Sequence, residues 1–150
     1  MTTQKLILLV DDNEDDVFLM ERALQAAQIS NPVRILEDGR EAINYLAGHG
    51  QYADREKFPL PAIVFLDLKL PFKSGHEVLQ WIRSQPQLET LVVVVLTSSN
   101  EPADIKRCYA LGANSYLVKP PTPEQLIDLA KSFKEYWLEF NRFDSLEPAS

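Results

Sequence analysis

The sequence has little cysteine, little positive charge and no long apolar stretch, and each shortage excludes a class of protein. Its single cysteine, Cys108, cannot build the disulfide framework of a small secreted domain. Lysine and arginine number 15 against 22 aspartates and glutamates, a net charge of -7. Such a surface repels nucleic acid and anionic lipid. The longest aliphatic run, residues 91–96, is far shorter than the roughly 20 residues that span a bilayer.

The start of the chain does not resemble an export signal. The first residues, MTTQKLILLVDD, lack the basic flank, long apolar stretch and cleavage site of such a signal. We therefore expect a cytoplasmic protein with no nucleic-acid or membrane partner. The length of 150 residues suits one domain around one core, over residues 1–150.

Short apolar runs alternate with longer segments of helical period. The runs cover residues 6–10, 62–66, 91–96 and 116–118, with a weaker one at 33–36. Continuous apolarity is typical of strands that helices cover on both faces. Because these runs alternate with helices, the sequence predicts a parallel α/β sheet of five β-α units.

Capping residues place several helix ends. Ser74 with Glu77 three residues later forms a capping box, and Thr122 followed by Pro123 is a strong start for the last helix. Gly112 can supply the left-handed cap that ends a helix at about 102–111. The first helix carries one apolar stripe, formed by Val17, Met20, Leu24 and Ala27.

Two segments are longer than this plan requires. Residues 47–61 form a long polar connection, and such connections are often functional or mobile. The last helix is predicted to run from Thr122 to about Phe140, with an apolar stripe that includes Phe133, Trp137 and Phe140. Beyond Phe133 the helix passes the depth of a five-stranded sheet. We therefore expect Trp137 and Phe140 to be exposed unless a partner covers them.

Polar residues follow four of the predicted strands at their carboxyl ends, where ligands bind in open parallel sheets. Asp11 and Asp12 follow the first strand, Asp67 the third, Thr97 the fourth and Lys119 the fifth. Each residue alone is ordinary in a cap or turn. Their joint occurrence at one edge indicates a functional site.

The residue types at this edge suit phosphoryl transfer to a carboxylate. Clustered carboxylates repel unless a cation is present, and Mg²⁺ prefers oxygen ligands, to which the backbone carbonyl of Lys69 can add one. Asp67 can attack phosphorus as a nucleophile, and Thr97 and Lys119 can stabilise the phosphoryl oxygens. No general base is required, and the histidines, His49 and His76, are predicted to be solvated.

The sequence resembles the receiver domains of bacterial response regulators over about residues 5–135. The matching motifs are VDD at 10–12, FLDLKLPFKSG at 65–75, VLTSS at 95–99 and YLVKP at 116–120. The resemblance implies a doubly wound, flavodoxin-like (βα)5 fold with strand order 2-1-3-4-5, followed here by an extended last helix and tail at about 136–150.

The resemblance also implies roles for these residues. Asp67 would accept phosphate from a histidine kinase, and Mg²⁺ or Mn²⁺ would be held by Asp12, Asp67 and the Lys69 carbonyl, with Asp11 acting directly or through water. A cis peptide would join Lys119 to Pro120. Thr97 and Tyr116 would form the switch that alters the surface of the fourth helix, fifth strand and fifth helix.

A narrower resemblance is to the small response regulators of cyanobacterial phytochromes, which are light-sensing histidine kinases. It is based on the 47–61 connection, the YWLEF segment at 136–140 and the lack of an output domain. It implies a phytochrome-like kinase as partner and a homodimer through the last strand and helix, with Phe133, Trp137 and Phe140 in the interface. The downstream effector cannot be named from the sequence.

Three alternatives remain open. The first is a phosphatase or phosphotransferase that forms an aspartyl phosphate, but such enzymes often carry a second aspartate two residues after the nucleophile, where this chain has Lys69. The second is a pseudo-receiver that takes no phosphate. The third is a flavodoxin-like cofactor binder, which the acidic strand ends disfavour. We expect a signalling switch and not an enzyme.

Overall fold

The computed structural model describes residues 5–146, which contain one sheet of five parallel strands in the order β2-β1-β3-β4-β5. The strand order and the five predicted strands are confirmed. The bounds are β1 (Ile7–Val10), β2 (Val33–Leu36), β3 (Ile63–Leu66), β4 (Val92–Thr97) and β5 (Ser115–Val118).

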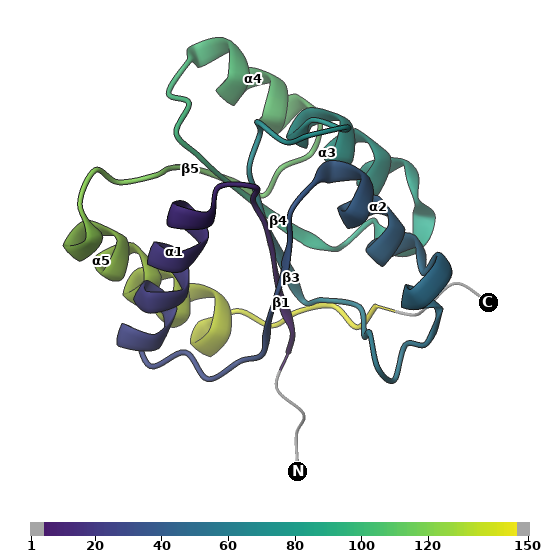
Figure 1. Cartoon of the computed structure of the whole chain (residues 1–150), viewed down its shortest axis with the longest axis horizontal. Coiled ribbons are helices and arrows are strands. Elements are labelled where there is room, and N and C mark those ends of the chain that lie inside the picture. The colour runs from purple at the N-terminus through teal and green to yellow at the C-terminus, as the bar shows by residue number, and fades with distance from the viewer. Residues whose placement is uncertain (1–4, 147–150) are drawn as a thin grey trace.

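Five α-helices cover the two faces of the sheet. They are α1 (Glu14–Ala26), α2 (Gly39–Ala47), α3 (Gly75–Ser84), α4 (Pro102–Ala110) and α5 (Pro123–Phe133), with short 3₁₀ turns at η1 (Gly50–Ala53) and η2 (Pro86–Leu88). Figure 1 shows α1 and α5 on one face and α2, α3 and α4 on the other. The predicted doubly wound architecture is therefore confirmed. Within residues 5–146 no helix has the length and apolarity of a membrane span.

Alternate strand residues divide the core into two layers, because successive side chains of a strand point to opposite faces. Leu8, Val64 and Val93 pack with the layer under α2 and α3. Their neighbours Ile7, Ile63 and Val94 pack with the layer under α1 and α5. The central strands are buried on both sides, which explains their continuous apolar sequence.

The predicted caps are present and fix the loops that carry the polar strand ends. Ser74 and Glu77 form the complete capping box of α3, and the Thr122 side chain accepts a hydrogen bond from the backbone N–H of Gln125. Gly112 lies in the left-handed region, with φ of 101°. This backbone conformation favours glycine, and a Cβ atom there would also lie 3.0 Å from the Arg83 side chain.

The 47–61 connection folds back on the end of α2. Arg55 donates hydrogen bonds to the carbonyls of Tyr45 (2.8 Å) and Leu46 (2.9 Å), which belong to the last turn of that helix. Tyr52 is buried and donates to Glu41 of α2, and its ring lies 5.1 Å from that of Phe58. The connection is therefore an ordered cover for this end of α2.

The last helix changes its winding where its burial ends. From Lys134 to Phe140 the backbone forms a π-helix, labelled η3, which turns more residues per repeat than an α-helix. The predicted α-helical stripe therefore does not continue unchanged. Phe133 is buried, with its ring 4.7 Å from that of Phe65, so its assignment to an interface is wrong: the ring completes the core.

Trp137 and Phe140 differ in exposure. Trp137 is only half-exposed, because the chain turns back after the helix and stacks Phe143 against it at 6.3 Å. The prediction that Trp137 is exposed unless a partner covers it is wrong for that reason. Phe140 is 72 % exposed, as predicted. After the helix, the chain crosses to the α2 and α3 side (Figure 1), where Asp144 accepts a hydrogen bond of 2.9 Å from Thr90.

Candidate functional site

The sheet ladder positions the aspartates at its carboxyl edge. The backbone N–H of Asp11 donates to Leu36 and that of Asp67 donates to Val10, so both residues continue the pairing of the strands that precede them. Asp11 and Asp67 are buried, whereas Asp12 is exposed. Carboxylate oxygens of the three residues lie within 4.8 Å of one another. The predicted acidic cluster is thus formed.

Gly75 keeps the loop after β3 close to Asp67. A Cβ atom at this position would lie 2.2 Å from the carbonyl oxygen of Asp67. The N–H of Gly75 also donates to the carbonyl of Leu68 at 2.9 Å. Because only glycine fits this close approach, Gly75 is needed for the position of Asp67. Lys69 lies exposed in the same loop, and the role of its carbonyl as a metal ligand stays a prediction.

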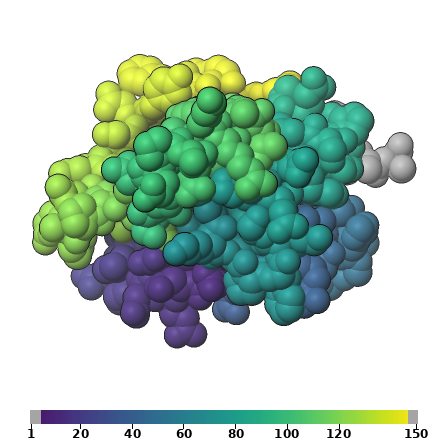
Figure 2. Space-filling model, turned by 90° about the horizontal axis from the view of Figure 1, so that it is seen from above, coloured from purple at the N-terminus to yellow at the C-terminus, as the bar shows by residue number. Residues whose placement is uncertain are grey.

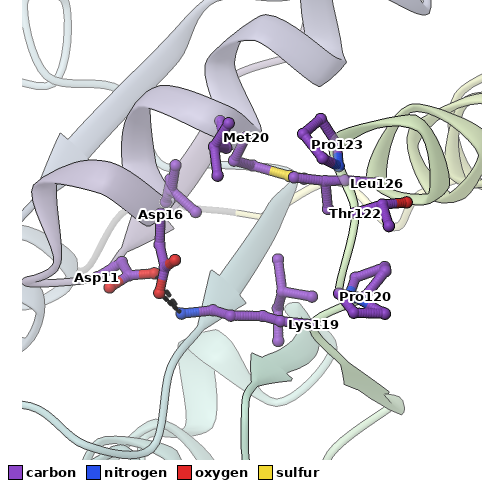
Figure 3. Close-up of a pocket in the computed structure, with 12 residues that line it drawn as sticks. Asp11, Asp16, Met20, Lys119, Pro120, Thr122, Pro123 and Leu126 are labelled. Atoms are coloured by element: carbon purple, nitrogen blue, oxygen red, sulfur yellow. Dashed lines mark hydrogen bonds and ion pairs between the residues drawn. The ribbon is translucent and has the colours of Figure 1, made fainter.

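Lys119 connects the acidic cluster to the end of β5. Its ammonium lies 2.8 Å from Asp11, 2.8 Å from Asp16 and 3.2 Å from Asp67. Figure 3 shows its side chain extending toward Asp11 and Asp16 along one side of a small cavity whose other end is lined by Met20, Pro123 and Leu126. The predicted association of Lys119 with Asp11 and Asp67 is present.

Asp16 is the member of this cluster that the sequence reasoning missed. An acidic residue in the first turn of α1 is favoured by the positive end of the helix dipole, and the backbone N–H of Asp16 donates to the Asn13 side chain at 2.9 Å. Its carboxylate nevertheless bonds Lys119. The spacing of the aspartates does not indicate this contact, because Asp12 precedes α1 and the partner of Asp16 is Lys119 at the end of β5.

Burial and charge act against each other on the ionisable groups of the site. Burial raises the pKa of Asp11, and the hydrogen bond from Lys119 opposes this effect. For Lys119, burial alone would lower the pKa, but the hydrogen bonds to Asp11 and Asp16 together with the charge of Asp67 raise it above its ordinary value. Lys119 is therefore a permanent cation in the site.

The donor set suits a hard divalent cation. Three carboxylates from two neighbouring strand ends gather their oxygens in one place, and oxygen atoms are the ligands that Mg²⁺ and Mn²⁺ prefer. Because Asp12 is exposed, such an ion would keep access to solvent and could retain water ligands. The residues Asp11, Asp12 and Asp67 therefore fit the predicted metal.

Thr97 and Tyr116 meet at the loop that follows β4. Thr97 is buried, and its hydroxyl accepts a long hydrogen bond of 3.4 Å from the N–H of Ser99. Tyr116 is half-buried and donates from its hydroxyl to the carbonyl of Ser99 at 2.9 Å. Ser99, which the sequence reasoning did not single out, is thus the contact between the two predicted switch residues.

The expected cis peptide at Lys119–Pro120 is wrong for this structure, because residues 5–146 contain no cis peptide bond. Trans is the lower-energy isomer of an X–Pro bond by about 0.5–1 kcal/mol. The side chain of Lys119 reaches its three carboxylates from the trans backbone. The cis isomer is therefore not needed to direct the ammonium into the site.

Comparison with protein families gives one match over most of the chain. The family model described as the response regulator receiver domain matches residues 7–131. These residues include all five strands, the acidic cluster, Thr97 and Lys119.

Two curated relatives match nearly the whole chain. A probable methanogenesis regulatory protein, FilR2 of Methanothrix harundinacea, is 41 % identical over 91 % of this chain and 86 % of its own length. The response regulator Rcp1 of Synechocystis is 38 % identical over 90 % of each chain.

Solved structures of similar proteins agree with the fold. The phosphorylated cyanobacterial phytochrome response regulator RcpA is 38 % identical, with a TM-score of 0.88 over 95 % of this chain and 99 % of that one. The Mn²⁺-bound form of Rcp1 is 36 % identical, with a TM-score of 0.85 over 94 % of this chain and 99 % of that one.

Proposed function

Because the chain belongs to the response regulator receiver family, we propose that Asp67 accepts a phosphoryl group from the phosphohistidine of a sensor kinase. The observation that supports this role best is the contact of Lys119 with Asp67 (3.2 Å) beside the carboxylates of Asp11 and Asp12. This arrangement offers a buried nucleophile, a fixed cation and a set of metal ligands in one place.

The transfer needs no general base. An oxygen of the Asp67 carboxylate attacks phosphorus, a P–O bond forms as the P–N bond to the donor histidine breaks, and the imidazole takes up a proton as it leaves. Lys119 neutralises the charge on the phosphoryl oxygens. Thr97 can donate its hydroxyl to another of these oxygens.

The reaction is proposed to require Mg²⁺ or Mn²⁺. Asp11, Asp12 and Asp67, together with the Lys69 carbonyl, would hold the ion, which when bound would supply positive charge beside the phosphoryl oxygens. The relative Rcp1 has a Mn²⁺-bound form, which supports the same chemistry here. The net negative charge of the cluster would otherwise oppose an incoming phosphate.

The phosphoryl group would act as a signal. Thr97, drawn toward the phosphate, would release the N–H of Ser99 and shift the loop against which Tyr116 is bonded. The change would then appear on the surface of α4, β5 and α5, where an effector binds. We propose a signalling switch and not a turnover enzyme.

The partner is proposed to be a phytochrome-like histidine kinase, because the similar protein RcpA is a phytochrome response regulator. We also propose a homodimer through the side of the molecule that carries β5 and the last helix. Phe140 and Tyr136, which are 72 % and 61 % exposed there, are apolar surface that a second copy could cover.

The test is a measurement of intact mass after incubation with acetyl phosphate. We expect the protein to gain one phosphate in the presence of Mg²⁺, none after chelation of the metal, and none in Asp67→Asn. Asp15→Asn is the control, since Asp15 is exposed and outside the cluster. If neither acetyl phosphate nor a phosphorylated kinase adds a metal-dependent phosphate, the chain is a pseudo-receiver instead.

A further inference from the structure

Two side chains of α4 form hydrogen bonds with neighbouring segments, one with the loop after β4 and the other with β5. In the first turn, the Asp104 carboxylate accepts a hydrogen bond of 2.6 Å from the Ser99 hydroxyl. In the last turn, the Tyr109 hydroxyl accepts a hydrogen bond of 3.1 Å from the backbone N–H of Tyr116. Between them, the Tyr116 hydroxyl donates to the Ser99 carbonyl at 2.9 Å. These three hydrogen bonds connect α4, the loop after β4 and β5 in a closed circuit.

The hydrogen bond from Tyr116 to Tyr109 replaces a backbone hydrogen bond that a neighbouring strand would otherwise supply. β5 is an edge strand that pairs with β4 alone, and N–H groups on the free side of an edge strand have no strand partner. The N–H of Tyr116 instead finds the hydroxyl of Tyr109. Because the Tyr109 side chain is 50 % exposed, packing alone does not explain its position.

Ser99 is the point at which Thr97 can influence this circuit. Its N–H is bonded to the Thr97 hydroxyl, its carbonyl to Tyr116 and its hydroxyl to Asp104. A displacement of Thr97 therefore reaches both ends of α4, one through Asp104 and the other through Tyr116 and Tyr109. Figure 2 shows α4, in green, at the surface, where a partner could detect its movement.

We propose that Asp104 and Tyr109 are positioning residues of the switch, which hold α4 to Ser99 and Tyr116 so that the helix responds to Thr97 as one body. The proposal deepens the proposed function, because it concerns the response to a phosphoryl group on Asp67. Neither residue touches the site, so both are expected to affect the response of α4 and not the uptake of phosphate.

The test uses NMR-detected amide hydrogen exchange of the full chain with Mg²⁺, with and without beryllium trifluoride as a stable stand-in for the phosphoryl group. Tyr109→Phe removes one hydroxyl and keeps the ring. Without the stand-in, it is expected to speed exchange of the Tyr116 amide about fivefold. This factor corresponds to the loss of one hydrogen bond with a net strength of about 1 kcal/mol. Tyr136→Phe, which removes a hydroxyl from another exposed tyrosine, is the matched control and should leave that rate unchanged.

The decisive readout is the change in α4 exchange that the stand-in induces. We expect this change to fall at least twofold in Tyr109→Phe and in Asp104→Ala. Asp104→Asn, whose amide oxygen can still accept from Ser99, should restore it. A purely structural role would speed α4 exchange equally with and without the stand-in and preserve the difference, and this result would overturn the proposal.

Phosphate uptake separates this proposal from the function that it depends on. If Asp67 gains phosphate normally in all variants but α4 responds as in the wild type, only the roles of Asp104 and Tyr109 are rejected. If the wild-type protein itself gains no phosphate and does not respond to the stand-in, the proposed function fails and the coupling fails with it.

Discussion

Lys119 is shared by three carboxylates, and this sharing limits how a phosphoryl group can enter. An ammonium has three N–H donors, and here Asp11, Asp16 and Asp67 each accept one. A phosphoryl oxygen that binds Lys119, as the proposed function requires, would therefore displace one carboxylate. The Asp16 side chain is 39 % exposed, against 5 % for Asp11, so water can replace its bond to Lys119 at the lowest cost. We expect Asp16 to be released first.

His76 is a buried histidine at the start of α3, contrary to the predicted solvated side chain. Its side chain is 10 % exposed, and its Nε2 atom lies 3.7 Å from the Asp104 carboxylate, too far for a hydrogen bond. Burial lowers the pKa of His76 below its ordinary value of 6.5, and the charge of Arg107 adds to this effect, while Asp104 opposes it. At neutral pH the ring is therefore uncharged.

The lowered pKa of His76 predicts a loss of stability in weak acid. Below pH 6.5 the unfolded chain binds a proton at this histidine more readily than the folded chain, so the free energy of unfolding should fall as the pH drops from about 6.5 toward the lower folded pKa and level off below it. His76→Gln cannot titrate and should lose less stability over this range. Urea unfolding from pH 7.5 to pH 5 measures both, with His49→Gln, in an exposed loop position, as the control. If the free energy of unfolding changes with pH in the same way for wild type and His76→Gln, His76 does not have a lowered pKa in the folded protein.

At the scale of elements, the 47–61 connection depends on Arg55. Its guanidinium satisfies two carbonyls at the end of α2 and also donates to the Phe58 carbonyl at 3.2 Å. Carbonyls in the last turn of a helix have no partner within the helix. Arg55 thus ties the connection to α2 and gives a long loop a fixed shape.

We predict that Arg55→Met lowers the free energy of unfolding by about 2 kcal/mol, the net worth of hydrogen bonds from a charged donor. Amide exchange should rise in residues 48–58 and stay unchanged in β3. Lys57→Met removes a charge from an exposed position of the same loop and should change the stability by less than about 0.5 kcal/mol. Urea unfolding of wild type, Arg55→Met and Lys57→Met measures these differences in stability. Equal stability of Arg55→Met and wild type would show that the loop is held by its aromatic contacts alone.

The elements that sequence predicts well depend on short-range chemistry. The capping box at Ser74 and the Thr122 cap were predictable because both partners lie within one helical turn. The strands were predictable because burial on both faces requires apolar residues at every position. The acidic cluster followed from the strands, since the ends of parallel strands meet at one edge.

The features that sequence did not predict depend on contacts between distant residues. A regular helical period predicts neither the π-helix from Lys134 nor the cover that Phe143 gives Trp137, which needs the chain to turn back after the helix. Asp16 joins the site only because Lys119, 103 residues later, reaches it. Likewise His76 lies beside Asp104 of α4, a helix that is close to α3 in space and not in sequence.

At the scale of the molecule, the acidic cluster and the exposed aromatic side chains lie in different places. The carboxylates and Lys119 occupy the carboxyl edge of the sheet, while Tyr109, Tyr136 and Phe140 are exposed on α4 and the last helix. Neutral aromatic surface suits contact between two copies better than charged surface does, because copies of a protein with net charge -7 repel each other.

The proposed homodimer predicts that Phe140→Lys shifts the protein toward monomer. In a two-fold interface each substitution acts twice, so losing an aromatic contact of about 2 kcal/mol from both chains costs about 4 kcal/mol and raises Kd roughly a thousandfold. Trp137 is a poorer probe, because its contact with Phe143 makes it part of the fold. Phe72→Lys is the control, since Phe72 is 69 % exposed in the loop after β3. Sedimentation equilibrium should give a dimer mass for wild type and Phe72→Lys and a lower mass for Phe140→Lys. One common mass for all three proteins would reject an interface at the last helix.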